Sequence, residues 1–258
     1  MAALTGSSVA STYTGLLKTN DNGARGAEGS GDQCSDGAGN TIPLFVSATE
    51  VYAVGSGTGT SHTAFGKDCG VDLAAGTGNS LFGEGAGADV TTGEHNTAVG
   101  YRALYQGTTE TDDNVAVGFN AMSGAWTTAA VNDCVVVGSG AGAGALVAGA
   151  SGLTAVGKAA GAAVTSGAKN TAVGFGAGTA LTTSDNNVAM GYNALYRGTT
   201  ESDDNVAIGY NAMSGNFTTN AVNDCVVIGS GAGAGTLTAA ASGLTAVGTS
   251  AGAAMTSG

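Results

Sequence analysis

Proline, aromatic rings and basic side chains are all scarce in this chain. Among 258 residues there is one proline, 5% are aromatic, and seven Lys and Arg residues stand against 19 Asp and Glu residues. Because a groove for nucleic acid needs clustered cations, the net charge of −12 excludes that class of partner. No stretch approaches the roughly 20 apolar residues of a membrane span, and no basic segment followed by an apolar run opens the chain. We therefore expect neither membrane insertion nor a secretory signal.

The side-chain combinations that carry catalysis are missing as well. No Ser/His/Asp set and no pair of carboxylates stands out, and the two histidines, His62 and His95, lack the pattern of a zinc site. The run from Gly138 to Gly144 has the glycine content of a dinucleotide-binding loop, but it recurs 91 residues later among repeats without helix-forming segments. We predict no enzyme activity and no cofactor.

What the chain contains instead is a five-residue phrase that occurs eleven times, a small apolar strand ending in glycine. The steps between successive phrase glycines are 17, 17, 18, 20 and 19 residues, and this series then repeats. Short repeats of this kind are typical of a solenoid, in which glycine tolerates the turn that each coil requires. We call these positions the rung glycines: Gly66, Gly83, Gly100, Gly118, Gly138, Gly157, Gly174, Gly191, Gly209, Gly229 and Gly248.

The residues around each rung glycine alternate in size. The residue before it is always apolar, the one before that is nearly always Ala, and the residue three positions after it is Ala in ten repeats and Cys69 in the first. Since successive side chains of a strand point to opposite faces, the face with Ala and Gly lines the narrow interior of a coil built from two short strands and two turns. The predicted fold class is all-β, a repetitive β-solenoid or β-roll.

So thin a coil leaves its row of larger aliphatic side chains on the outside. A long exposed stripe of Val and Ile would be sticky, and burial against copies of the same chain would remove it. We expect a homo-oligomer, an intertwined or parallel homotrimeric fibre. With strands about 4.8 Å apart, the repeats form a rod on the order of 50 Å long.

The series of steps also defines a longer repeat of 91 residues. Positions 101–167 and 192–258 are identical at 52 of 67 places. A third copy has just begun at residue 258, whereas natural solenoids usually end in an atypical capping repeat. We expect the solenoid, residues 61–258, to continue in a longer polypeptide.

Asparagine and cysteine are both predicted to be structural. Stacked Asn side chains can hydrogen-bond along a coil, and His62 takes the Asn position in the first repeat. Cys134 and Cys225 lie on equivalent coils roughly 24 Å apart, so they cannot bond to each other within one chain. We expect buried free thiols, with interchain disulfides as the alternative. The phrase begins with Asn79, Asn96, Asn114, Asn170, Asn187 and Asn205.

Two acidic turns are weak candidates for a metal site. Clustered carboxylates could supply the oxygen ligands of Ca²⁺. Neither the EF-hand spacing nor the nonapeptide of calcium-binding rolls is present, so a solvated acidic turn is the competing interpretation. The residues are Glu110, Asp112, Asp113, Glu201, Asp203 and Asp204.

Aromatic residues follow the rung glycine in five repeats: Tyr101, Phe119, Phe175, Tyr192 and Tyr210. Other repeats have Lys or Glu at this position, so it is predicted to face outward. Outward rings could stack on the sugars of a cell-surface glycan, or they could cover neighbouring coils or chains. The loops around Trp126 and Phe217 are expected to protrude. The candidates for surface binding are Tyr101, Tyr105, Trp126, Tyr192, Tyr196 and Phe217.

Residues 1–60 lack the phrase and form a separate predicted module. The segment contains Leu16, Leu17 and Lys18, followed by the run DGAGNTIPL at 36–44. It resembles the N-terminal region of many bacteriophage tail-fibre and related virion-fibre proteins, where a leucine-lysine-rich start precedes a D-G-x-G-N-x-x-P-L element. The resemblance implies a β module for virion attachment at the virion-proximal end of a trimeric fibre.

The repeats, most clearly NTAVG at 96–100, are similar to those of trimeric autotransporter adhesin heads and of phage and algal-virus fibre proteins. Those families imply interlocked trimeric β-rolls that bind surfaces. The missing secretory signal, coiled-coil stalk and membrane barrel disfavour the secreted adhesin.

The expected function is therefore that of a virion structural protein, a phage tail fibre that contributes to host-surface attachment. Its expected partners are two further copies of itself, other tail or capsid proteins through the N-terminal region, and a host-cell glycan. A capsid decoration or head-fibre protein and a bacterial trimeric surface adhesin are the alternatives. An ice-binding solenoid would need a flat Thr-x-Thr ladder, which the repeats lack.

Overall fold

In the computed structural model of the protein, the described residues are 62–73, 76–106, 110–124, 130–147, 150–197, 201–215 and 221–255, with the backbone of three earlier two-residue strands. The contacts divide the chain into two compact units, Met1–Val51 and Tyr52–Gly258. The boundary expected near residue 60 falls outside the described residues and stays a prediction. In the first unit, β1 (Lys18–Thr19) pairs antiparallel with β2 (Cys34–Ser35).

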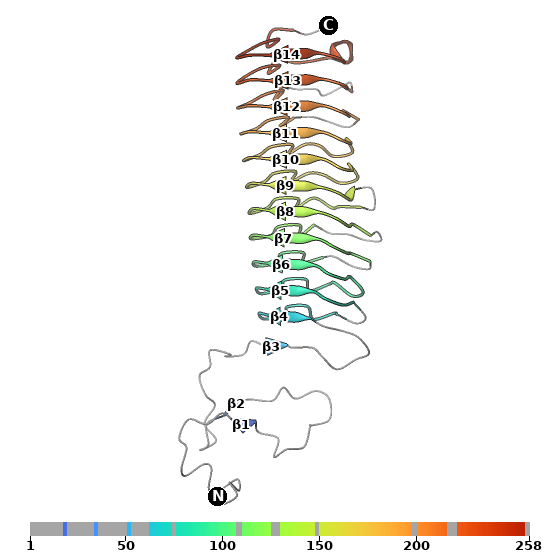
Figure 1. The fold of residues 1–258 in the computed structure, drawn as a ribbon, viewed down its shortest axis with the longest axis vertical. Coiled ribbons are helices and arrows are strands. Elements are labelled where there is room, and N and C mark those ends of the chain that lie inside the picture. The colour runs from blue at the N-terminus through green and yellow to red at the C-terminus, as the bar shows by residue number, and fades with distance from the viewer. Residues whose placement is uncertain are drawn as a thin grey trace, which may run out of the picture. The chain divides into compact units, whose positions relative to one another are not determined.

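The second unit is a stack of coils, each contributing one strand to a single parallel sheet (Figure 1). The sheet order runs without a crossover from β14 to β4 and on to β3 (Val51–Tyr52). Neighbouring strands are in register, so that Ala172 lies between Ala155 and Ala189. The strands are β4 (Thr63–Phe65), β5 (Ser80–Phe82), β6 (Thr97–Val99), β7 (Val115–Val117), β8 (Val135–Val137), β9 (Thr154–Val156), β10 (Thr171–Val173), β11 (Val188–Met190), β12 (Val206–Ile208), β13 (Val226–Ile228) and β14 (Thr245–Val247).

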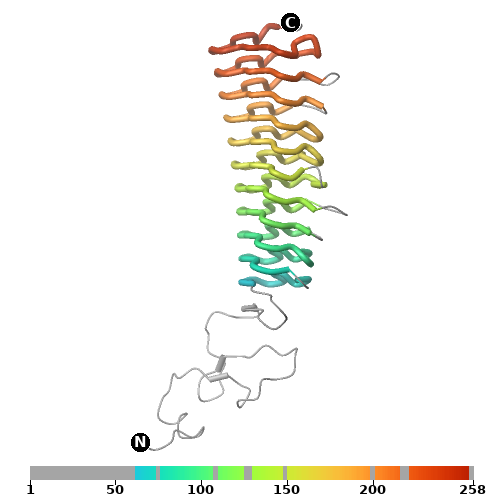
Figure 2. The backbone as a smooth tube through the Cα atoms, turned by 45° about the vertical axis from the view of Figure 1, so that its right-hand side comes forward, coloured from blue at the N-terminus to red at the C-terminus, as the bar shows by residue number. Residues whose placement is uncertain are grey.

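The all-β solenoid is thus confirmed, but the expectation of two strands per coil is wrong. Among its described residues, each coil has one three-residue strand, and turns and bends make up most of the rest. Figure 2 shows the backbone winding through the stacked coils. A short 3₁₀ turn, η2 (Ala239–Ala241), precedes β14. The turns are stacked by hydrogen bonds like the strands: the Asn120 amide donates to the Tyr101 carbonyl at 2.9 Å. No helix among the described residues is long and apolar enough to cross a membrane.

The rung glycines sit where consecutive coils come closest. Gly118 has φ +137°, and a Cβ built on it would lie 2.7 Å from both the carbonyl carbon and the carbonyl oxygen of Gly138 in the next coil. The same backbone contact recurs at every rung glycine from Gly66 to Gly229. Because a carbonyl of the neighbouring coil cannot rotate away, only glycine fits at the ten positions from Gly66 to Gly229, which supports the structural role predicted for the rung glycines.

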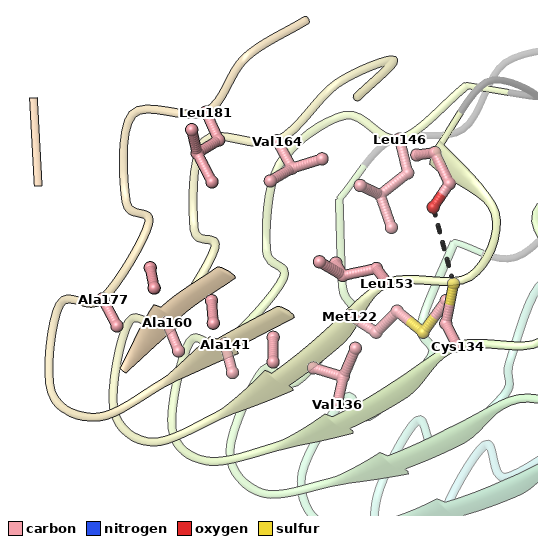
Figure 3. Close-up of a cluster of buried hydrophobic side chains, with 14 of the residues drawn as sticks. Met122, Cys134, Val136, Ala141, Leu146, Leu153, Ala160, Val164, Ala177 and Leu181 are labelled. Carbon is pink, nitrogen blue, oxygen red and sulfur yellow. Dashed lines mark hydrogen bonds between the residues drawn. The ribbon is translucent and has the colours of Figure 1, made fainter. Parts of the chain in front are cut away.

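The interior of each coil is lined by the middle residue of the strand and by the Ala three positions after the rung glycine. Both rows are buried, including Ala98, Ala103 and Cys69, except that Ala251 in the last coil is partly buried. Figure 3 shows Ala141, Ala160 and Ala177 in one row and the larger Leu146, Val164 and Leu181 in a second row facing it. The small-residue interior is therefore confirmed on one side only, because larger side chains fill the other.

These larger side chains reach the interior by one of two routes. The fourth position after the rung glycine has a left-handed φ in every coil. In four coils a buried Leu or Met occupies it, and the burial, worth roughly 1.5–3 kcal/mol, offsets a backbone cost of about 1–2 kcal/mol. In the other seven coils Gly occupies it, and an apolar residue three or four positions later fills the same space. The two sets are Leu104, Met122, Leu195 and Met213, and Leu73, Val90, Leu146, Val164, Leu181, Leu237 and Met255.

The close approach of coils predicts a large difference between two Gly→Ala substitutions. Gly118→Ala should lower the free energy of unfolding by more than about 3 kcal/mol, because the added Cβ meets backbone. Gly140→Ala is the matched control, since nothing lies within 4 Å of its Cβ position and Ala159 has the equivalent left-handed conformation. It should cost about 1–2 kcal/mol. Urea unfolding followed by circular dichroism measures both, and equal losses would contradict the steric argument.

Candidate functional site

The outer face of the sheet is the most distinctive surface of the described residues. The first and third residues of each strand point outward, and none of them in β4–β14 is charged. Phe65, Phe82, Val99 and Met190 are each about 40% exposed or more, whereas the middle residues of the same strands are buried. The predicted external row of larger aliphatic side chains is confirmed, and two aromatic rings join it. An uncharged strip therefore runs along the whole stack.

A row of aromatic rings lies beside this strip, one residue past the rung glycine. Phe119, Phe175, Tyr192 and Tyr210 are 45–57% exposed, and Tyr101 is 37% exposed, so the predicted outward orientation is confirmed. The rings stack on one another from coil to coil. Tyr101 and Phe119 have centroids 5.4 Å apart, and Tyr192 lies between Phe175 and Tyr210 at 5.4 and 5.2 Å.

This stacking determines which parts of the rings are accessible. The interplanar angles are 10–12°, so both faces of Tyr192 are covered by its neighbours. Sugar stacking on the row would have to use the outer faces at the ends of each stack or the ring edges. Part of the predicted covering of neighbouring coils is thus present within one chain.

Two cations border the aromatic row. The Arg102 guanidinium lies 5.2 Å from the centroid of Tyr101 and 4.9 Å from that of Tyr105, and the Lys158 ammonium lies 5.7 Å from that of Phe175. Cation–π contacts at exposed sites contribute about 0.5–1 kcal/mol each. Tyr196, the counterpart of Tyr105, is 37% exposed. Trp126 and Phe217 lie outside the described residues.

The predicted asparagine ladder is present inside the coils. The Asn79 Oδ1 accepts hydrogen bonds from both the backbone N–H and the side-chain amide of Asn96, at 2.9 and 3.0 Å. Asn96 does the same for Asn114, at 3.1 Å for each bond. Five of the six side-chain amides also donate to a carbonyl 14–17 residues further on, as Asn79 does to Gly93 at 2.7 Å, whereas Asn187 donates to the Asp185 carbonyl at 2.9 Å. The amides are buried and satisfied, which supports the structural interpretation.

A second ladder, which the sequence analysis missed, runs two residues before the first. The Asp203 Oδ1 accepts from the Asp185 amide at 2.7 Å, and the Asp203 amide donates to the Asn223 Oδ1 at 2.8 Å. In the preceding 91-residue copy, the Asp112 Oδ1 accepts from the Glu94 amide at 2.8 Å. The sequence contained a signal for this ladder. In most coils the position two residues before the first ladder holds Asp, Asn or Ser, and each of these side chains can accept a hydrogen bond.

The acidic turns are therefore divided in their roles. Asp112 and Asp203 serve the second ladder, whereas Glu110, Glu201 and Asp204 are exposed. Asp113 is also exposed and lies 3.5 Å from the His95 ring. Among the residues that the structure describes, no three His, Cys, Asp or Glu side chains are grouped so that they could hold a metal ion.

The cysteine prediction is confirmed for the three thiols that the structure describes. Cys69, Cys134 and Cys225 are buried and free. Burial raises the pKa of Cys134 to about 11, which keeps this thiol protonated at neutral pH. The Cys134 Sγ donates to the Ala150 carbonyl at 3.6 Å (Figure 3). The side chain of Cys34 lies outside the described residues.

The dinucleotide-like run 138–144 begins at the rung glycine of β8 and continues through the stacked turn that follows. It has the same place in its coil as every other post-strand turn. Comparison with known proteins adds no further assignment: no family model, no curated protein and no solved structure matches this chain.

The second ladder predicts different outcomes for two substitutions of one carboxylate. Asp203→Ala should lower the free energy of unfolding by roughly 1.5–3 kcal/mol, because the Asp185 amide loses a charged acceptor. Asp203→Asn should stay close to wild type, because an amide oxygen already serves at Asn223. Thermal melts with and without millimolar Ca²⁺ measure both. A Ca²⁺-dependent rise in melting temperature that Asp203→Asn abolishes would instead favour a metal site.

Proposed function

We propose that this chain is a structural fibre protein of a phage-like virion, in which the solenoid is a shaft or head assembled as a homotrimer. The observation that carries the proposal is the unbroken row of apolar third strand residues, which lies within the uncharged strip on the outer face of β4–β14. Soluble monomers rarely expose a continuous apolar surface of this length, and such surfaces mark protein–protein contacts. Three identical strips meeting at one axis would remove all of them from water.

The choice of a virion fibre is supported by the resemblance of residues 1–60 and of the repeats to fibre proteins. A rod on the order of 50 Å long with a continuous core suits a part that spans distance and presents its turns to the outside. No catalytic group is needed for this role. Attachment to a host surface is the larger purpose, with Tyr101, Tyr105, Tyr192 and Tyr196 as the described candidate contacts.

The oligomeric state of the chain in solution tests whether the strips are buried against other copies. Sedimentation equilibrium of the purified chain should give a mass of three times 24.4 kDa. A species of 24.4 kDa at micromolar concentration would contradict the burial argument. A stable dimer would contradict the threefold arrangement while leaving an interface between copies in place.

A charged side chain placed on the strip should prevent the proposed assembly without unfolding the chain. Val99→Glu should yield a folded but dissociated chain, because the 38% exposed Val99 side chain would place a carboxylate in the interface. Ala145→Glu, at an exposed turn position, is the control and should remain assembled. Sedimentation reports the mass, and circular dichroism reports whether the solenoid persists. If Val99→Glu keeps the wild-type mass, the strip is not the interface.

The gene's neighbourhood distinguishes the related assignments. Flanking tail genes favour the tail fibre, and flanking capsid genes favour a decoration or head-fibre protein. A secretion signal and a membrane anchor within the full gene would instead favour a bacterial trimeric surface adhesin.

A further inference from the structure

The asparagine ladder begins with a residue of different chemistry. His62 occupies the position that Asn fills in six later coils, and its ring is only 7% exposed. Its Nδ1 accepts hydrogen bonds from the backbone N–H and from the side-chain amide of Asn79, both at 3.3 Å. These two donors are the counterparts of the Asn96 donors that bind the Asn79 Oδ1.

The other side of the His62 ring also matches the asparagine pattern. The backbone at Gly76 takes a hydrogen bond from His62, as Gly93 takes one from the Asn79 amide, and both pairs are separated by 14 residues. A neutral imidazole has one acceptor and one N–H donor, so it reproduces the donor and acceptor of an asparagine side chain. With Nδ1 as the acceptor, the proton lies on Nε2. A protonated imidazole has two donors and no acceptor.

We propose that His62 is a pH-sensitive cap of the solenoid, whose protonation separates the first coil, residues 62–78, from the second. The added proton would lie on Nδ1 and point at the backbone N–H and the side-chain amide of Asn79. These two donors would then lose Nδ1 as their acceptor. Later coils are insensitive, because the amides of Asn79, Asn96 and Asn114 do not titrate in this range. The effect is therefore confined to one end of the stack.

The surroundings of His62 favour this behaviour. Burial lowers the pKa of His62 below its ordinary 6.5, and the hydrogen bond at Gly76 opposes that shift only in part. The segment that packs on the ring, 76–79, contains Gly, Thr and Asn but no titratable side chain. The first titratable groups in the same columns, Glu94 and His95, lie one 17-residue repeat further along the chain, and neither contributes to the shift.

The sign of the effect follows from the lowered pKa. The folded coil binds the proton less readily than the unfolded coil does, so stability rises with pH while the unfolded state is the more protonated one. The contribution of neutral His62 is therefore complete well above pH 6.5 and is lost as the pH falls below that value. The inference concerns the first coil alone and does not depend on the proposed trimer.

Hydrogen exchange tests the cap. In the full chain, protection factors of the amides that join the first two coils, Thr63 and Gly83, should fall about tenfold between pH 7.5 and pH 5, the order expected when buried donors lose their acceptor. The amides of Gly118 and Gly138, which join later coils, serve as the internal reference. Rates are corrected for the intrinsic pH dependence of exchange.

Two variants and one spectroscopic readout complete the test. His62→Asn restores the ladder residue and should keep the protection of Thr63 and Gly83 at pH 5. His95→Asn, at the exposed histidine, should behave as wild type. The loss of protection should follow the titration of the His62 ring signal by NMR. Unchanged wild-type protection, an equal loss in His62→Asn, or a loss that follows His95 instead would each overturn the proposal.

Discussion

The contact between backbones at the rung glycines is the constraint on which the other features depend. Where Gly118 passes Gly138, the coils approach so closely that no Cβ fits. This spacing holds the strands in parallel register and brings each turn within hydrogen-bonding distance of the next. Side chains at equivalent positions then form columns, so any polar group placed inward meets a copy of itself. The ladders and the aromatic stacks are consequences of that alignment.

Because equivalent side chains are aligned, buried polar groups in the middle of the stack can hydrogen-bond to both neighbouring coils. Groups at the ends of the stack cannot. An Asn amide inside the array, such as Asn96, accepts from the coil after it and donates to the coil before it. The first described member, His62, has a described ladder partner on one side only. A repeated structure with identical interior coils can therefore place a specialised function only at a terminus or on its outer columns. The buried His62 and the exposed aromatic row are features of these two kinds.

The fold was predictable from periodicity because one geometric requirement, the rung glycine, recurs in every coil. The Asn ladder followed from the same reasoning. The turns were harder to predict: Leu104 and Leu195 have left-handed backbones, and local propensity gives no reason to expect a Leu there. Their burial outweighs the strain, and that gain appears only when the opposite wall is in place. The Asp203 ladder was missed for a similar reason, since a carboxylate in a turn is normally solvated.

The described coils of a single chain close their own interior, so the proposed assembly depends on the outer face rather than on an unfinished core. The two 91-residue copies within the chain differ in a way that fits this view. The third residue of each strand is exchanged only for another apolar residue, as Val117 is for Ile208. At turn positions, a charged residue can be exchanged for an uncharged polar one, as Lys158 is for Thr249. A solvated face would tolerate polar replacements at Val117 as readily as at Lys158. The third strand position is restricted like a buried position although Phe65, Val99 and Val247 are each more than a third exposed, which is the pattern expected of a surface that contacts another copy.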